Sequence, residues 1–256
     1  MKLAIMQPYF FPYIGYWQLI HAADKFVLFD DAQYMRHGWV NRNRILKPNG
    51  GWQYITVPLK KHSVTELIKN VQVQPQDEWS KLIIRQIAHY KKKAQYFDET
   101  NELIKNILQN QVGLSIAKIN FYSIKEICKH LDMNKEIILS SDRNFDYSNV
   151  GDAGDWALRI SEQLKASEYI NPAAGNELFN EDKFLSSHIK LSFLKSQVTA
   201  YSQRREFEPA LSIIDVLMFN GIEGTKRLLK NYSVEMSERS EYIVEMQDAS
   251  NVSDRT

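Results

Sequence analysis

Cysteine is almost absent from this sequence: its 256 residues include one, Cys128. One cysteine cannot close an intramolecular disulfide or build a zinc cluster, which excludes a fold held by disulfides. The six histidines show neither H-x-H nor H-E-x-x-H spacing, so we expect no bound metal ion. Cys128 shares one helical face with Ile124, Ile127 and Leu131, which is typical of a small core side chain rather than a nucleophile.

Long apolar runs and an excess of charge are also missing. The N-terminal apolar run stops after four residues, short of the roughly seven that a secretory signal needs. No stretch approaches the ~18 apolar residues of a membrane span, so we expect a cytoplasmic protein without a membrane partner. Lys and Arg total 32 against 31 Asp and Glu, a net charge of +1. That balance argues against a nucleic-acid partner, whose binding favours a basic face.

Three signatures of nucleotide and ester chemistry are absent as well. The chain has no glycine-rich phosphate loop ending in Gly-Lys-Ser or Gly-Lys-Thr, no G-x-G-x-x-G after a strand and no G-x-S-x-G. A P-loop nucleoside triphosphatase, a standard dinucleotide enzyme and an α/β-hydrolase are therefore disfavoured. We expect no tightly bound cofactor.

What the sequence does contain is an alternation of strand and helix signals. With 44% hydrophobic and 25% charged residues, it has the composition of a globular protein with a sizeable core. Residues 3–7 indicate a buried strand ended by Pro8, residues 14–23 a helix, and residues 25–29 a second buried strand. Strand, helix and strand within about thirty residues form a βαβ unit. We predict an α/β fold, a Rossmann-like open and mostly parallel sheet with a helical insertion.

The remaining segments extend this pattern. Strands are predicted at residues 52–59, 67–73, 136–140, 168–170 and 189–194, and helices at 78–94, 97–110, 115–131, 155–166 and 210–220, the last closed by Gly221. These segments predict an α/β core formed by residues 1–75 and 133–232. They also predict a helical insertion or lid at 76–132 and a loosely packed polar tail at 233–256.

Aromatic and hydrogen-bonding side chains are concentrated in the first sixty residues. Flat rings beside amides, guanidinium groups and carboxylates suit a pocket for a sugar ring or a nucleotide. The candidate substrate-binding residues are Gln7, Tyr9, Tyr13, Tyr16, Gln33, Trp39, Asn41, Arg42 and Asn43. Arg42 and Arg44 suit a bidentate grip on a diphosphate. For each residue the alternative is core packing or loop capping, whereas the concentration of the whole cluster favours a site.

Carboxylates mark two further places. Asp30 and Asp31 end a buried strand at the edge of the sheet where such folds bind ligands, so one of them can face the ligand as a base or a hydrogen-bond acceptor. Asp215 stands in an otherwise apolar helix, three residues after Ser212 and on the same face. It is either a surface residue or a buried carboxylate that needs a partner, and we interpret the pair as supporting the substrate site.

Four strings carry a resemblance to a known family. They are MQPYFFPYIGY at residues 6–16, DDAQY at 30–34, WVNRNR at 39–44 and FEPALSIID at 207–215. On these strings the chain resembles the WbqC-like protein family over about residues 1 to 231. The resemblance implies a place beside O-antigen and natural-product biosynthesis enzymes. It further implies transfer of an acyl or aminoacyl group, glycyl among them, to the amine of a nucleotide-linked amino sugar.

The implied N-acyltransferase would take its acyl group from a thioester on coenzyme A or an acyl carrier protein. Asp31 or His37 would accept the proton of the attacking amine, and Gln7 or Asn43 would position the donor or stabilise the oxyanion. Aromatic rings would hold the sugar. No covalent enzyme intermediate is required, in keeping with the lack of an obvious nucleophile.

Two other functions remain open on sequence grounds. The order strand, loop, Tyr13-Ile14-Gly15-Tyr16, helix and strand is similar to the entry of HIGH-type nucleotidyltransferases. Tyrosines replace both histidines of that motif, and the second nucleotidyltransferase signature is missing. A non-catalytic sugar-nucleotide-binding protein would keep the aromatic pocket and need no base, so loss of turnover with retained binding on mutation of Asp31 would favour an enzyme.

Overall fold

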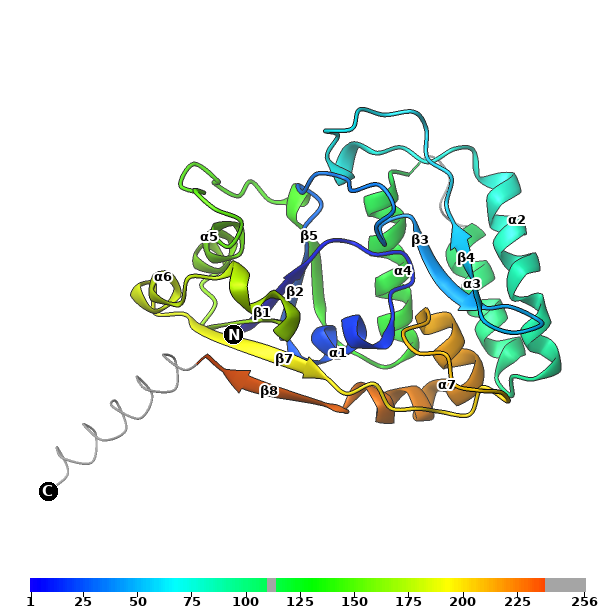
Figure 1. Cartoon of the computed structure of the whole chain (residues 1–256). Coiled ribbons are helices and arrows are strands. Elements are labelled where there is room, and N and C mark those ends of the chain that lie inside the picture. Colours follow the sequence, from blue (N-terminus) through cyan, green and yellow to red (C-terminus); the bar gives the residue numbers. More distant parts are fainter. Residues whose placement is uncertain (110–113, 238–256) are drawn as a thin grey trace, which may run out of the picture.

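A six-stranded sheet forms the centre of the computed structural model, which describes residues 1–109 and 114–237. Across the sheet the strands run in the order β5 (Glu136–Leu139), β2 (Lys25–Leu28), β1 (Lys2–Met6), β6 (Glu168–Pro172), β7 (Lys190–Ser196) and β8 (Tyr232–Met236) (Figure 1). Adjacent strands are parallel except for β8, which pairs antiparallel with β7. The predicted α/β fold with a mostly parallel sheet is confirmed.

The strand order reverses between β1 and β6. From β1 the chain builds outward through β2 and β5 on one side, and through β6 and β7 on the other. Such a reversal leaves the carboxyl ends of the two central strands free of crossing connections, and open α/β sheets bind ligands there. The residues that follow β1, β2 and β6 therefore occupy the place where this topology favours a site.

Helices cover both faces of the sheet. On one face lie α5 (Asp155–Gln163) and α6 (Glu181–Ser186), and on the other α1 (Ile14–Ala22), α4 (Ile116–His130) and α7 (Ile213–Leu229) (Figure 1). Side chains of β1 alternate between the two cores, Leu3 and Ile5 packing with α5 and Ala4 with α1. Because both faces of β1 are buried, its sequence is a continuous apolar run.

The inserted helices continue the larger of the two cores. Helices α2 (Gln76–Ile87) and α3 (Phe97–Gln109) and the short 3-10 helix η2 (Ala88–Lys92) contribute buried residues to the same cluster as α1 and α7. Helix α3 packs on α7, and α4 packs on β5. The expected helix over 97–110 is present to Gln109, and residue 110 lies outside the described residues. Within the described part of the chain, no helix is both long and apolar enough to cross a membrane.

One strand prediction was wrong, and one strand was missed. The predicted strand at 52–59 is present as β4 (Trp52–Thr56), which pairs in a separate hairpin with β3 (Arg42–Leu46), a strand that was not predicted. The first strand of the hairpin begins with three polar residues, Arg42, Asn43 and Arg44, which is a weak signal of a strand. The segment 67–73 forms the 3-10 helix η1 (Ile68–Asn70) between isolated bridges. Two further 3-10 helices follow β5 and β6, η3 (Ser140–Asp142) and η4 (Ala173–Leu178).

The last helix and the tail also differ from expectation. Helix α7 begins at Ile213 and continues past Gly221 to Leu229, although Gly221 breaks it with φ 60° and ψ −167°. Gly221 thus closes one helix, as predicted, and the chain then enters a second directly. The segment 233–236 belongs to strand β8, so the polar tail does not begin at residue 233. Residues 238–256 of that tail lie outside the described residues.

Gly221→Ala should destabilise the protein by about 3 kcal/mol, because its backbone conformation is accessible to glycine only. A Cβ would also lie 2.7 Å from the ring of Tyr96. Gly51→Ala is the matched control, since Gly51 has φ 61° and no neighbour within 4 Å of a Cβ, and it should cost about 1 kcal/mol. Urea unfolding measures both, and equal losses would contradict this account of the kink.

Candidate functional site

The first loop, residues 7–13, turns its carbonyl oxygens into the protein. Each needs a donor there, because an unpaired buried carbonyl is costly. The Tyr16 hydroxyl donates to the carbonyl of Gln7 at 2.9 Å, and the Trp17 indole donates to that of Pro12 at 3.0 Å. The Asn120 amide donates to Pro8 at 2.8 Å. Phe11 accepts from the Asn43 amide at 2.9 Å and from the Ser212 hydroxyl at 2.8 Å, and the Asn43 amide also donates to Phe10 at 3.0 Å. The loop backbone is therefore held by α1, α4, β3 and the start of α7.

Several residues predicted to bind substrate serve this support instead. Exposed fractions are 2% for Tyr16, 3% for Asn43 and 0% for both Ser212 and Asp215, so none of these side chains faces solvent. The Asn43 side-chain amide donates both of its hydrogen bonds to loop carbonyls, and the Ser212 hydroxyl caps α7 by accepting from the backbone amide of Ile214. Their place in the structure corrects the expectation of direct contact. The supporting role interpreted for Ser212 and Asp215 agrees with this geometry.

Asp215 is the buried carboxylate with partners rather than the surface residue. It accepts hydrogen bonds from the hydroxyls of Tyr90 and Tyr201, both at 2.6 Å, and from the amide of Gln203 at 2.9 Å. Burial raises the pKa of Asp215 to about 6, although these three donors act against the shift. The Tyr90 hydroxyl also accepts from the backbone amide of Leu46, which links β3 to α7 through the carboxylate.

Asp30 connects the ends of two strands. Its carboxylate is 1% exposed and accepts from the Ser140 hydroxyl at 2.9 Å and from the Ser141 hydroxyl and amide at 2.6 and 3.0 Å. These bonds join the carboxyl end of β2 to that of β5. The Asp30 carboxylate thus bonds only within the scaffold, so of the two carboxylates after β2 it is Asp31 that has access to solvent.

Asp31 follows β2 and pairs with two residues from distant segments. Lys69 donates to one carboxylate oxygen at 2.7 Å, and the Tyr147 hydroxyl donates to the other at 3.0 Å. Burial acts to raise the pKa of Asp31, but the hydrogen bonds from Lys69 and Tyr147 and the nearby Ser140 hydroxyl outweigh it and lower the pKa. Asp31 therefore stays ionised at neutral pH and is a weak proton acceptor, so its predicted role as base loses support.

Residues of the segment 33–42 mostly bind their own backbone. The Asn41 amide donates to the carbonyl of Val57, and its oxygen accepts from the Tyr34 hydroxyl at 2.8 Å. The Gln33 side chain is exposed and donates to a backbone carbonyl at 2.8 Å. The Arg42 guanidinium donates to the carbonyls of His37 and Gly38 and stacks 4.2 Å over the ring of Tyr54. These bonds occupy the edge of Arg42 that would grip a diphosphate.

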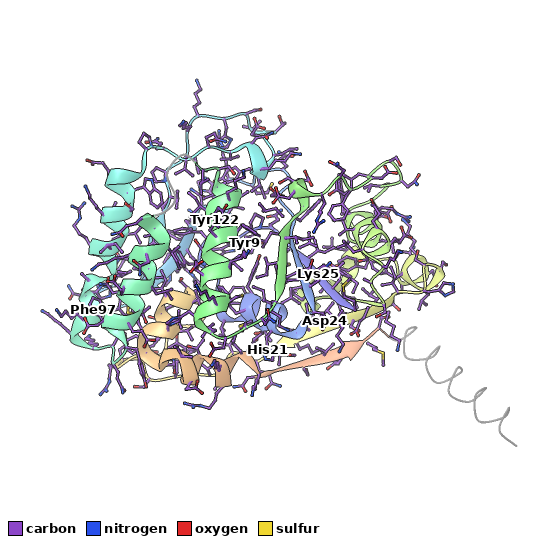
Figure 2. All side chains as sticks on the ribbon, turned by 180° about the vertical axis from the view of Figure 1, so that it is seen from behind. Tyr9, His21, Asp24, Lys25, Phe97 and Tyr122 are labelled. Carbon is purple, nitrogen blue, oxygen red and sulfur yellow. The ribbon has the colours of Figure 1, made fainter. Side chains whose placement is uncertain are left out.

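Five of the predicted side chains remain accessible around the first loop. Gln7, Tyr9, Tyr13 and Trp39 are half-buried, and His37 is exposed on a turn with φ 63°. Among the described residues, the side chains of Gln7, Tyr9 and His37 have no hydrogen-bond partner. The carbonyl of Trp39 accepts from the amide of Phe10, so the turn that carries His37 adjoins the loop. In Figure 2, Tyr9 lies beside α4, far from His21 and Asp24 at the opposite end of the strands.

An aromatic cluster that was not predicted from the sequence lies beside Asp31, at the carboxyl edge of the sheet. Tyr147 packs on Trp156 with ring centroids 4.7 Å apart, and Phe29 lies 5.4 Å from Trp156 and 6.3 Å from Tyr147. All three rings are half-buried. Lys69, which holds Asp31, was missed too. The available signal was positional, because Tyr147 follows the predicted strand 136–140 and the carboxyl ends of parallel strands share an edge.

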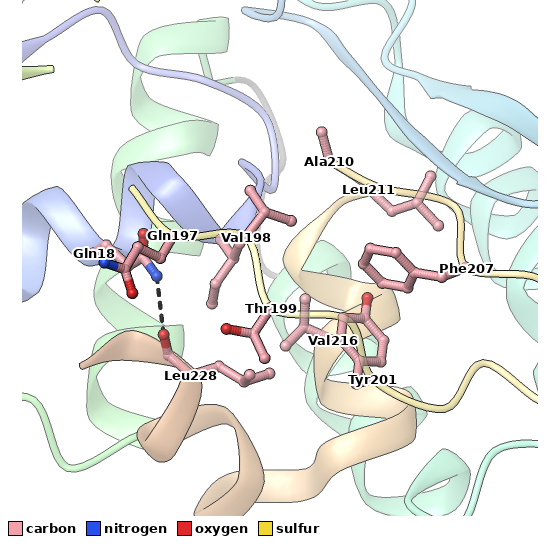
Figure 3. Close-up of a pocket in the computed structure, with 11 residues that line it drawn as sticks. Gln18, Gln197, Val198, Thr199, Tyr201, Phe207, Ala210, Leu211, Val216 and Leu228 are labelled. Atoms are coloured by element: carbon pink, nitrogen blue, oxygen red, sulfur yellow. Dashed lines mark hydrogen bonds between the residues drawn. The ribbon is translucent and has the colours of Figure 1, made fainter. Parts of the chain in front are cut away.

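Cavities also lie elsewhere in the described part of the molecule. Figure 3 shows a pocket of about 10 Å³ between α1, α7 and the segment after β7, lined by residues that include Gln18, Tyr201 and Leu228. That volume holds about one water molecule, which excludes a substrate. A cavity of about 540 Å³ lies beneath the β3–β4 turn and is lined partly by Lys93 and Arg205. Among residues 1–109 and 114–237, no group of His, Cys, Asp and Glu side chains could hold a metal ion.

Comparison with known proteins places the chain in a family. The model of the WbqC-like protein family matches residues 7–227. The chain belongs to the WbqC-like protein family. A relative in Mycobacterium tuberculosis, named as the uncharacterized protein Rv1507c, is 28% identical over 228 residues, which cover 87% of this chain and 95% of the relative. No solved structure matches this WbqC-like chain.

Removing the Asp215 charge should change how stability depends on pH. Between about pH 4 and pH 6 the folded protein keeps this proton, whereas the unfolded chain, with a pKa of 3.8, releases it. Raising the pH through that window therefore lowers the wild-type free energy of unfolding, by about 3 kcal/mol from this group. In Asp215→Asn this contribution should vanish, as urea unfolding at several pH values would show.

Glu126→Gln, which changes an exposed carboxylate on α4, is the control and should retain the wild-type pH dependence. If Asp215→Asn and wild type lost stability in parallel between pH 4 and pH 6, the assignment of a raised pKa to Asp215 would be wrong.

Proposed function

We propose that this WbqC-like protein transfers an acyl or aminoacyl group, such as glycyl, from a thioester to the amine of a nucleotide-linked amino sugar. The reaction would serve the assembly of O-antigen or a related polysaccharide. The observation that carries the proposal is the position of Gln7, whose unpaired amide follows β1 at the point where the strand order reverses. This is where open α/β sheets bind ligands.

The chemical character of the surrounding side chains supports a nucleotide-linked sugar. Half-buried rings of Tyr9, Tyr13 and Trp39 lie around the first loop, and the carboxylate of Asp31 follows the neighbouring strand. Sugar rings pack on aromatic faces and present hydroxyls to amides and carboxylates. The resemblance to the WbqC-like family, which implies a place beside O-antigen and natural-product biosynthesis enzymes, supports the same class of substrate.

The transfer requires few groups from the protein. The substrate amine attacks the thioester carbonyl, a C–N bond forms, the C–S bond breaks, and the thiolate leaves with a proton. We assign the acceptance of the amine proton to His37 rather than Asp31, because a carboxylate with a lowered pKa is the weaker base. The Gln7 amide N–H would stabilise the oxyanion of the tetrahedral intermediate.

A covalent acyl-enzyme is not part of the proposal. Burial raises the pKa of the Cys128 thiol to about 12, and its side chain is 4% exposed on α4. A thiol in such surroundings is a poor nucleophile. The acyl group would therefore pass directly from its carrier, coenzyme A or an acyl carrier protein, to the amine.

Incubation of the purified protein with nucleotide-linked amino sugars and acyl or glycyl thioesters tests the proposal. Mass spectrometry should detect the amide product with at least one donor, carried on coenzyme A or on a carrier protein. The same sugars with a hydroxyl in place of the amine should give no product. An absence of amide product across all donors and acceptors would sink the proposed reaction.

Within an active system, His37→Ala should lower kcat by about 10²- to 10⁴-fold, as expected for loss of a general base. KM for the sugar nucleotide should stay near the wild-type value. His188→Ala is a matched control, since His188 is also exposed and has φ 56° against 63° for His37. A His37→Ala enzyme with wild-type kcat would remove His37 from the mechanism.

A further inference from the structure

The arrangement around Asp31 resembles a receptor for hydroxyl groups more than a catalytic base. Its carboxylate can accept about four hydrogen bonds, and Lys69 and Tyr147 supply two of them. The side chain is 11% exposed, so part of it still reaches the surface. The two donors fix the orientation of the carboxylate and favour its charge, which strengthens any hydrogen bond that it accepts from a ligand.

The position of Asp31 in the fold suggests which hydroxyls it would meet. It follows β2, the strand beside β1, in a doubly wound sheet. In dinucleotide-binding sheets of this topology an acidic residue about 20 positions after the first loop accepts hydrogen bonds from ribose hydroxyls. Gln7 at the start of the loop and Asp31 stand in that relation here.

An aromatic surface adjoins the carboxylate. Tyr147, which donates to Asp31, packs against Trp156 with the two ring planes tilted by 57°, and both rings are half-buried. A nucleoside whose ribose binds Asp31 can place its base against these rings, because base and ribose are directly linked. Stacking on aromatic side chains contributes about 1 to 3 kcal/mol per base in single-stranded nucleic-acid complexes and tolerates any base.

The likeness to dinucleotide sites does not extend to the phosphates. Those sites place the pyrophosphate against the first helix, where glycines let the backbone approach. Here the ring of Tyr13 lies 2.5 Å from the position of a Cβ on Gly15, so it covers the start of α1. The phosphates of a bound nucleotide must therefore lie away from the N-terminus of α1. The comparison with dinucleotide sites thus applies to the nucleoside alone.

We propose that Asp31 binds the 2′- and 3′-hydroxyls of a ribonucleoside, with the base packed against Tyr147 and Trp156. This inference rests on the proposed function in that the nucleoside belongs to the nucleotide-linked acceptor. It gives the site a preference for ribonucleotides over their deoxy counterparts. It also makes Asp31 a binding residue rather than the base.

Titration calorimetry of the full-length protein with ADP, GDP, CDP and UDP, and with their 2′,3′-dideoxy counterparts, tests the inference. At least one ribonucleotide should bind about 10- to 100-fold more tightly than its dideoxy form, the range expected for losing hydrogen bonds to a charged group. Asp31→Asn should weaken the ribonucleotide by a similar factor and leave the dideoxy form unchanged. Asp142→Asn, an exposed carboxylate in η3 at the same edge, should change neither.

Tryptophan fluorescence locates the base independently. Binding should quench the wild-type emission, and Trp156→Phe should remove most of the change while the affinity stays within about threefold, since an aromatic ring is kept. Equal affinities for ribo and dideoxy forms, an equal loss of both in Asp31→Asn, or no nucleotide binding would overturn the inference. If Asp31→Asn does not fold, the wild-type comparison decides alone.

The outcome is separable from that of the transfer assay. Amide formation on deoxynucleotide- and ribonucleotide-linked acceptors with equal efficiency would support the proposed function and reject the ribose contact. A ribonucleotide preference that depends on Asp31, without amide product from any donor, would support the ribose contact and reject the acyl transfer.

Discussion

Inward-facing carbonyls of the first loop impose the main constraint on this structure. Prolines at both ends of the loop prevent it from joining a ladder, so its buried oxygens take their hydrogen bonds from side chains. Asn43, Asn120 and Ser212 supply them from the hairpin, helix α4 and the start of the last helix. Three segments far apart in the sequence are thereby tied to one loop, and Asp215 stabilises the contact between two of them.

A fixed backbone determines which side chains the loop presents. Because its carbonyls are satisfied internally, the half-buried side chains of Gln7, Tyr9 and Tyr13 stand on a rigid base where the strand order reverses. The neighbouring strand adds a second fixed group, since Lys69 and Tyr147 orient the carboxylate of Asp31. Rigid support of this kind lets a few polar groups select a ligand without closing a deep cavity.

The sequence predicted the central sheet well and the site only in outline. Strands β1, β2 and β5 are short apolar runs with polar limits, which identifies buried parallel strands. Asn43 and Ser212 were predicted as site residues because they are polar and lie in the family strings. A sequence does not reveal whether such a side chain faces a ligand or a buried carbonyl. Lys69 and Tyr147 lie 38 and 116 residues from Asp31, and only the tertiary fold brings the three side chains together.

A crystal structure with a UDP-linked amino sugar would show whether a nucleotide-linked sugar binds, as proposed, at the carboxyl ends of β1, β2 and β6. We expect ligand density over Gln7 and Asp31, with the backbone of the first loop unchanged. Density confined to the cavity of about 540 Å³ beneath the β3–β4 turn, with Gln7 and Asp31 uncovered, would contradict it.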